Sequence, residues 1–302
     1  MELMLRLCKN MNKEIINIIN TMFKEEGLHE TFLKDVKICK SVSYSPREPL
    51  IYDFCLIIVL EGKKTGYLPN RNISYSSDNY IVVPTILPFE CETYASKEDP
   101  FSCILVSIDN QVMYELIDTI SKDEPIDIKK DNLSVFEDKV SPQIEDVIFR
   151  LVNILKSKED SEILGNQILR ELFYRIAMGK NASFLHKMFL NTTNEAKIAR
   201  VLKYIHQNYM RNLDIPTLAR KEDMSASSFN AHFKRITMHT PLQYIKKIRL
   251  NKARDFISKY NYQVNETAQM VGYESIPQFS NDYKSYFGHA PKYAKPYCSG
   301  SK

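Results

Sequence analysis

Two stretches near the carboxyl end decide the fold of this chain: Leu213–Pro241, LDIPTLARKEDMSASSFNAHFKRITMHTP, and Val264–Pro291, VNETAQMVGYESIPQFSNDYKSYFGHAP. They repeat one design about fifty residues apart, with a small-residue contact, a turn, aromatic anchors four residues apart and a closing proline. The repeated design predicts two copies of a short helix, a tight turn and a second helix. Each copy is therefore interpreted as a helix-turn-helix unit.

Capping residues mark where these helices begin. Asp214 is the expected N-cap of the first short helix, and Ser225 and Ser275 precede the expected second helices, 226–236 and 276–287. A further helix from Leu242 to about Lys259 joins the two units. At about 1.5 Å per residue it spans about 27 Å. This length suits two reading helices about one DNA turn apart on one face of a duplex.

The outward faces of the two second helices carry the candidate base contacts. The aromatic anchors point inward at helical spacing, which leaves these polar and small residues outside: Ser227, Asn230, Ala231, Pro277, Gln278 and Asn281. Asn and Gln pair with adenine, and an alanine methyl packs on the thymine methyl. Since neither face offers an arginine, we expect a preference for A·T-rich sites.

Hydroxyl and basic residues beside these faces are the candidate phosphate contacts. They are Ser225, Lys234, Arg235, Lys246, Lys247, Ser275, Ser280 and Lys284. Some basic residues of the joining helix could instead form internal ion pairs, and Arg249 is the residue for which this alternative is strongest because it lies next to the inward side.

The formal charge is distributed unevenly along the chain. Residues 1–190 hold 23 Lys and Arg against 29 Asp and Glu, a net of −6, whereas residues 191–302 hold 18 against 8, a net of +10. A basic carboxyl-terminal third is the electrostatic pattern expected for a polyanionic partner, and the two repeated units make double-stranded DNA that partner.

The amino-terminal two thirds predict an α+β arrangement. A short amphipathic helix is expected at 11–26, and short β-branched and aromatic runs between residues 36 and 108, separated by turn residues, predict an antiparallel barrel or sandwich. Helical periodicity returns with helices at about 113–120, 142–156 and 163–178. The domains expected are therefore 1–190, with its helical segment 110–190, a linker at 191–196, and an all-α domain at 197–302. The wide apolar faces of the helices at 142–178 fit packing on the barrel or a dimer interface equally well.

Cysteine and histidine usage limits the chemistry. The six cysteines form no CxxC pair, and no apolar run or cleavable leader marks a membrane span or signal peptide, so we expect reduced thiols in a cytoplasm. No histidine lies between His29 and His186, so a metal-dependent barrel enzyme is not expected. No phosphate-binding loop or nucleophile elbow is found either. We therefore expect no metal, no cofactor and no enzymatic activity.

At these residues the chain resembles the AraC/XylS family of bacterial transcription regulators. MSASSFNAHFK, TPLQYIKKIRLNKAR, VGYESIPQFSNDYKSYFG and APKY carry the resemblance in the last hundred residues. YSPREPLIYDFCLIIVLEGKK and DNYIVVPTILPFECETYASKEDPF extend it to a branch with a cupin-like amino-terminal barrel, some members of which respond to reactive aldehydes. Ala231 and Asn281 depart from the arginine common in the family, so the operator of a relative does not transfer.

The resemblance implies a promoter-binding regulator, an activator acting as a homodimer, with RNA polymerase as a further partner and a small molecule or electrophile as effector. Cys91, in FECETY, is the candidate for reaction with an electrophile, although buried thiols are usually inert. Two alternatives stay open. One is a regulator without a small-molecule ligand, controlled by a protein partner through the helices at 142–178. The other is a cupin enzyme with an appended interaction domain, which the missing histidines disfavour.

Overall fold

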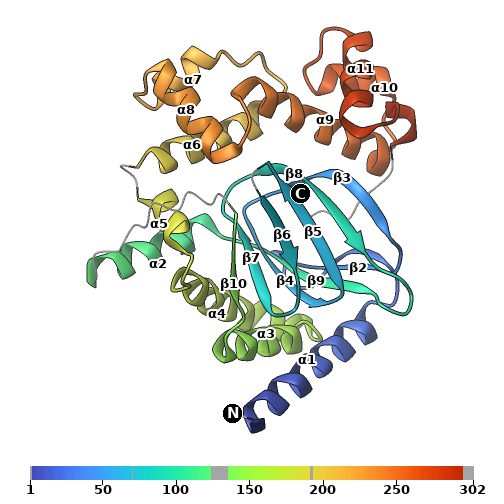
Figure 1. The fold of residues 1–302 in the computed structure, drawn as a ribbon, viewed down its shortest axis with the longest axis vertical. Coiled ribbons are helices and arrows are strands. Elements are labelled where there is room, and N and C mark those ends of the chain that lie inside the picture. The colour runs from blue at the N-terminus through green and yellow to red at the C-terminus, as the bar shows by residue number, and fades with distance from the viewer. Residues whose placement is uncertain (1, 70, 124–134, 191–192, 295–302) are drawn as a thin grey trace.

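The computed structural model describes residues 2–69, 71–123, 135–190 and 193–294. An amino-terminal domain of antiparallel sheets and helices is followed by a helical domain that lies over one edge of the sheets (Figure 1). The α+β class predicted from the sequence is confirmed, with an antiparallel sheet domain first and a helical domain with two helix-turn-helix units after it. Most of the charged loop expected at 121–132 lies outside the described residues.

The strands form two antiparallel sheets. The six-stranded sheet has the order β1-β2-β9-β4-β7-β10, and the four-stranded sheet has the order β3-β8-β5-β6. The strands are β1 (Gly27–Glu30), β2 (Val36–Ser41), β3 (Ser45–Tyr52), β4 (Cys55–Glu61), β5 (Lys63–Leu68), β6 (Arg71–Tyr75), β7 (Asn79–Val83), β8 (Leu87–Tyr94), β9 (Phe101–Ser107) and β10 (Phe136–Lys139).

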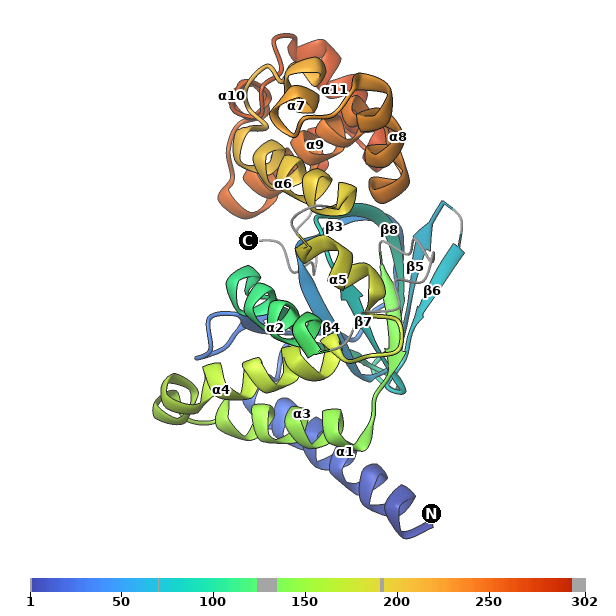
Figure 2. The ribbon, with the colours of Figure 1, turned by 90° about the vertical axis from the view of Figure 1, so that its left-hand side faces the viewer.

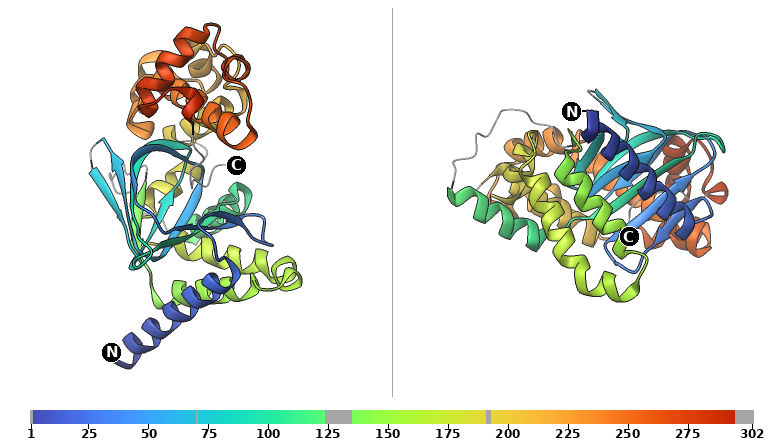
Figure 3. Two further views of the ribbon diagram at one scale, coloured as in Figure 1. Left: turned by 90° about the vertical axis from the view of Figure 1, so that its right-hand side faces the viewer. Right: turned by 90° about the horizontal axis from the view of Figure 1, so that it is seen from below.

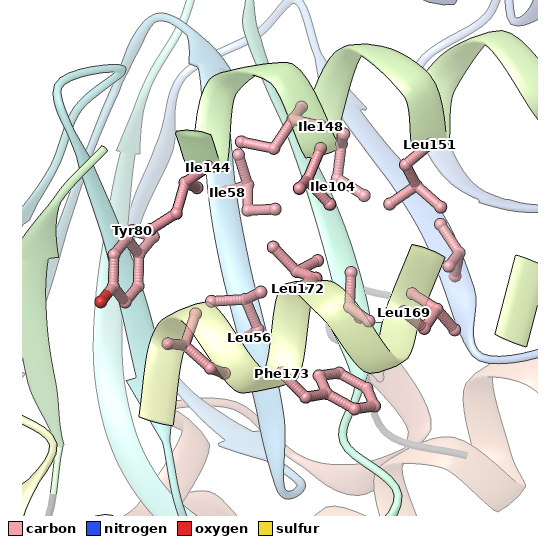
Figure 4. Packing of buried hydrophobic residues seen from close by; sticks show 14 of the residues in the cluster. Leu56, Ile58, Tyr80, Ile104, Ile144, Ile148, Leu151, Leu169, Leu172 and Phe173 are labelled. Carbon is pink, nitrogen blue, oxygen red and sulfur yellow. The ribbon is translucent and has the colours of Figure 1, made fainter. Parts of the chain in front are cut away.

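Both faces of the six-stranded sheet are buried, which explains the continuous apolar runs of β4 and β9. Alternate residues of β4 divide between two cores. Leu56 and Ile58 face the covering helices, whereas Cys55, Ile57 and Val59 face the barrel interior. Figure 4 shows the outer core, in which Leu56 and Ile58 pack against side chains of two covering helices, α3 (Pro142–Ile154) and α4 (Lys158–Ala177).

Four strands were not predicted, and β3 shows why. Pro46 and Pro49 suggest turns, yet both lie within β3. Because β3 is an edge strand of its sheet, the missing N–H groups cost no ladder bond there. β1, β6 and β10 are only four or five residues long and carry little periodicity. The segment flanked by Pro84 and Pro88 was expected to be an edge or a kink. There the chain passes from β7 in one sheet to β8 in the other, and Pro88 lies within β8.

Helices cover the outer face of the six-stranded sheet. They are α1 (Glu2–Met22), α2 (Asn110–Asp123), α3 (Pro142–Ile154), α4 (Lys158–Ala177) and α5 (Ser183–Phe189). Figures 2 and 3 show α1, α3 and α4 gathered on the side of the sheet away from the carboxyl-terminal domain. The apolar sides of α3 and α4 are buried in the outer core, so packing on the sheet is the observed role of those faces.

The carboxyl-terminal domain is helical throughout its described part. Its helices are α6 (Asn194–Asn208), α7 (Ile215–Lys221), α8 (Ala226–Thr237), α9 (Pro241–Tyr260), α10 (Val264–Met270) and α11 (Ile276–Phe287), followed by the short 3₁₀ turn η1 (Pro291–Tyr293). Asp214, Ser225 and Ser275 are N-caps, as predicted. α6 begins at Asn194 with Thr193 as its N-cap, so the helix starts inside the stretch expected to be a linker.

The joining helix α9 lies over the edge strand β3 and its neighbour β8 (Figure 1). Tyr244 Oη donates a hydrogen bond to the Ile86 carbonyl (2.8 Å), and Arg254 donates to the Pro49 carbonyl (2.8 Å). α9 thereby covers an edge strand that would otherwise present unpaired backbone groups. It also holds both helix-turn-helix units against the amino-terminal domain.

Candidate nucleic-acid interface

The reading helix of the first unit is α8. Phe229 and Phe233 are fully buried, with ring centroids 5.5 Å apart, and they fix α8 against α6 and α9. Ser227, Asn230 and Ala231 are all exposed on the opposite side. The Asn230 side-chain amide donates to the Ala226 carbonyl of its own helix (2.9 Å). This face is small, polar and uncharged, so it can enter a major groove.

The reading helix of the second unit is α11. Phe279 and Tyr283 are fully buried, and Pro277, Gln278 and Asn281 are exposed. α8 and α11 lie toward opposite ends of α9 (Figure 1), whose twenty residues span about 30 Å. The two polar faces therefore lie toward the two ends of a helix whose length is close to one DNA turn, about 34 Å.

The candidate phosphate contacts fall into two groups. Lys234 and Lys284 are exposed near the carboxyl ends of α8 and α11. Ser225 and Ser275 are occupied as helix caps, since each side-chain oxygen accepts from a backbone N–H three residues on (3.3 Å). Ser280 is half-buried beside the exposed Asn281.

Three of the candidate cations have partners within the protein. Arg235 pairs with Glu195 (2.7 Å), and Lys246 pairs with Asp282 of α11 (2.5 Å). Lys247 is half-buried, and its Nζ lies 3.2 Å from His239 Nε2; burial lowers the pKa of this lysine. Their assignment to phosphate stays a prediction. Because the partners lie up to 40 residues away in sequence, no local pattern could have revealed them.

Arg249 makes contacts inside the protein, the alternative that was considered strongest for this residue. Its guanidinium donates to the Tyr209 carbonyl (2.8 Å) and the Arg211 carbonyl (2.9 Å). These bonds tie α9 to the loop between α6 and α7, so Arg249 braces the domain from inside.

Two histidines lie between the domains. His239 Nε2 is 3.2 Å from the Pro88 carbonyl, and His206 Nε2 is 3.9 Å from Asp53 Oδ1. Burial lowers the pKa of each histidine to about 4, with Lys252 adding to the effect at His206 and Lys247 at His239. Both are therefore neutral at neutral pH, and the approach of His206 to Asp53 is not an ion pair there.

A cavity of 920 Å³ opens between the barrel and α9. The least exposed lysine that lines it is Lys64, at 4%, and its Nζ lies 5.7 Å from the Tyr52 ring centroid and 5.8 Å from that of Phe101. Sequence reasoning did not single out Lys64. Its place at a buried position of the alternating strand KKTGYL was the available signal, because lysine is almost never buried without a specific partner.

Cys91 also lines this cavity but is 2% exposed. The Tyr52 hydroxyl lies 3.8 Å from its Sγ, and burial raises the pKa of the thiol. A reactive cysteine needs the opposite shift, so the surroundings of Cys91 disfavour its reaction with electrophiles, which stays an untested prediction.

Within the described ranges, no group of three or more His, Cys, Asp or Glu side chains lies close enough together to hold a metal ion. The same part of the chain contains no helix with the length and apolar character needed to cross a bilayer.

Comparison with known proteins assigns the class. The family model for the AraC-type transcriptional regulator N-terminus matches residues 33–184, about half of the chain, and a helix-turn-helix domain model matches residues 218–294. The chain therefore belongs to the AraC-type transcriptional regulators, as the sequence motifs indicate.

Individual relatives are more distant. The raffinose operon regulator RafR of Pediococcus pentosaceus is 28% identical over 146 residues, 48% of this chain and 51% of its own length. The transcriptional activator FapR of Escherichia coli is 22% identical over 241 residues, 71% of this chain and 91% of its own. Over the first matches, the chain spans about half the length of the curated relatives, or less.

Among solved structures, unsaturated fatty acid-bound ToxT from Vibrio cholerae superposes with a TM-score of 0.59 at 13% identity, over 85% of this chain and 92% of its own. At that identity the likeness concerns the fold alone. It extends across both domains.

Proposed function

We propose that this protein is a sequence-specific DNA-binding transcription regulator. One observation carries the proposal: all six predicted base-contact residues are exposed on α8 and α11, while the aromatic residues of the same helices are buried. The outward sides of α8 and α11 therefore contribute little to the core of the protein and are accessible to a partner. A basic carboxyl-terminal third supports attraction to a duplex.

Gel retardation tests the proposal on DNA that flanks the coding sequence. The full chain should retard one fragment more tightly than a scrambled competitor of the same length at physiological salt. Asn230→Ala and Gln278→Ala should each weaken that complex, while Gln207→Ala, an exposed substitution on α6, should not. Equal retardation of specific and scrambled DNA would contradict the proposal.

The cavity between barrel and α9 is proposed as the effector site, for an amphipathic carboxylate. Lys64 supplies a buried cation between aromatic rings, and Leu50, Phe101 and Phe256 supply apolar lining. The fatty acid bound by ToxT belongs to this chemical class. Because α9 lines the cavity with Lys252 and Lys259, an occupant would contact both domains.

A thermal-shift titration with oleate tests the effector site. Oleate should raise the melting temperature of the wild type, and Lys64→Met should abolish the shift. Lys63→Met is the matched control, because Lys63 precedes it on the exposed face of β5. An unchanged melting temperature in the wild type would contradict the effector site and favour the alternative, a regulator controlled by a protein partner.

A homodimer is proposed through the outer face of α4. Ile163, Tyr174 and Met178 are 59%, 43% and 56% exposed and follow one helical stripe. The double substitution Ile163→Asp and Met178→Asp should convert a dimer to a monomer in sedimentation, whereas a monomeric wild type would favour a different protein partner. RNA polymerase contact, activation and a cytoplasmic location are further parts of this proposal, and no catalytic role is proposed.

A further inference from the structure

The register of the six-stranded sheet sets two cysteines opposite each other. β2 and β9 run antiparallel with Cys39 facing Cys103, and both side chains belong to the core of the barrel interior. The other two cysteines that lie on described strands face no thiol across their ladders. Cys55 is paired with Val83 and Ser107, and Cys91 with Glu48 and Gly66.

The backbone spacing at this pair suits a disulfide. The Ser107 N–H donates to the Asp35 carbonyl (2.8 Å), and these two residues continue the same register one step beyond Val36 and Val106. Hydrogen-bonded pairs alternate along an antiparallel ladder, so Cys39 and Cys103 form another such pair, with Cα atoms about 5.5 Å apart. Disulfides bridge Cα separations of about 4.4–6.8 Å, most often near this value.

Small solutes have a path to the pair. Cys39 lines the 920 Å³ cavity, although its side chain is only 2% exposed, and Cys103 lies directly across the ladder from it at 3%. A peroxide molecule is small enough for that space. A bulky thiol reagent is not expected to react with the folded protein at the same rate.

From this geometry we propose that Cys39 and Cys103 are a redox-active dithiol that hydrogen peroxide converts to a cross-strand disulfide. The Cys39 sulfur attacks one peroxide oxygen, the O–O bond breaks, and one water leaves with the thiol proton, which gives a sulfenic acid. The Cys103 sulfur then attacks the Cys39 sulfur, the S–O bond breaks and a second water leaves. Two thiols are oxidised by two electrons and one peroxide is reduced to two waters.

The bond joins positions 64 residues apart and removes the Cys39 thiol from the cavity wall. Closing it draws the two Cβ atoms together by about 1–2 Å, from the spacing of a hydrogen-bonded cross-strand pair to disulfide spacing. Such a bond is easily reduced. We therefore expect reversal by dithiothreitol.

Thiol counting in denaturant provides the test. The reduced full chain has six cysteines and should take up six maleimide labels. After peroxide treatment of the folded protein, four labels are expected, with dithiothreitol restoring six. Tryptic mapping should find residues 38–40 joined to residues 98–122, a species two hydrogen atoms lighter than the sum of its parts.

Variants separate this pair from the others. Cys39→Ala should keep all five remaining labels after peroxide. Cys103→Ala should fall from five to four, because the Cys39 sulfenic acid has no thiol to resolve it, and dithiothreitol should restore five. Cys55→Ala should fall from five to three. If either variant fails to fold, the wild-type peptide map still decides. A disulfide mapped to any other pair, oxidation confined to Cys91, or six labels after peroxide would overturn the proposal.

Discussion

The two helix-turn-helix units share a design but differ in how they are held. The turn of the first unit places Asp223 at φ +50°, whereas the second uses Gly272 at φ +86°, where a Cβ would meet the Met210 carbonyl oxygen at 2.5 Å. α11 contacts β3 directly and is tied to α9 through Asp282, while α8 pairs through Arg235 with α6. The reading helix of the second unit thus contacts the barrel itself, whereas that of the first unit is held by α6, and both carry uncharged outward faces.

The shared core gives the largest expected effects. Phe229 and Phe279 are fully buried in one continuous cluster that also contains the inward face of α9. Phe229→Ala and Phe279→Ala should each lower the free energy of unfolding by about 3–5 kcal/mol in chemical denaturation. Hydrogen exchange should then rise in both units for either variant. Exchange confined to the mutated unit would mean that the units fold independently.

Loss of the Arg254 contact with the barrel should affect the second helix-turn-helix unit more than the first. Arg254 is 2% exposed; it donates to Pro49 and lies 4.5 Å from the centre of the Phe287 ring. Arg254→Met should cost about 1.5–3 kcal/mol because a buried charged hydrogen bond is lost, with faster hydrogen exchange in 276–287 than in 226–237. Tyr244→Phe, the control, loses one neutral bond and should cost about 0.5–1.5 kcal/mol. Equal hydrogen exchange in α8 and α11 of Arg254→Met would mean that this contact with the barrel does not hold the second unit more than the first.

The contacts between the two domains could not be predicted from the sequence. Periodicity and capping located α8 and α11 because their signals are local: anchors four residues apart and a serine before each helix. Arg254 bonds to a carbonyl 205 residues earlier in a strand whose prolines suggested turns. Contacts of that range depend on how the domains pack. The exposure of the six candidate base contacts followed from the local pattern, whereas the partners of Arg235, Lys246 and Lys247 did not.

The two units are expected to contact different base pairs of one site. Asn230→Ala and Gln278→Ala should each reduce specific DNA affinity by about 1–3 kcal/mol, because an Asn or Gln amide pairs with an adenine edge. Sites selected from random DNA should lose preference at different positions for the two variants, and G·C-rich selected cores would contradict the expected A·T bias. If both variants relax the same base pair, the units do not occupy separate grooves.

Acid should weaken the contact between the domains. The folded-state pKa of His206 and of His239 is about 4, below the ordinary value of about 6.5. Each histidine binds its proton more readily when exposed, so stability is full above about pH 6.5 and falls as the pH drops toward 4. The wild-type melting temperature should decline over that window, and less steeply in His239→Asn. Identical pH profiles would show that His239 stays shielded during unfolding.

The smallest expected effects concern single lysines at the DNA face. Lys234 is exposed on the first unit, whereas Lys246 pairs with Asp282 of the second at 2.5 Å. Lys234→Ala should reduce the slope of log affinity against log salt by about 1, since one phosphate contact releases about one counterion. Lys246→Ala should change the slope less, because Asp282 already neutralises that lysine in the free protein. Titration of one labelled operator at several salt concentrations measures both slopes. A larger change for Lys246 would mean that DNA breaks the ion pair, and that the second unit rearranges on binding while the first does not.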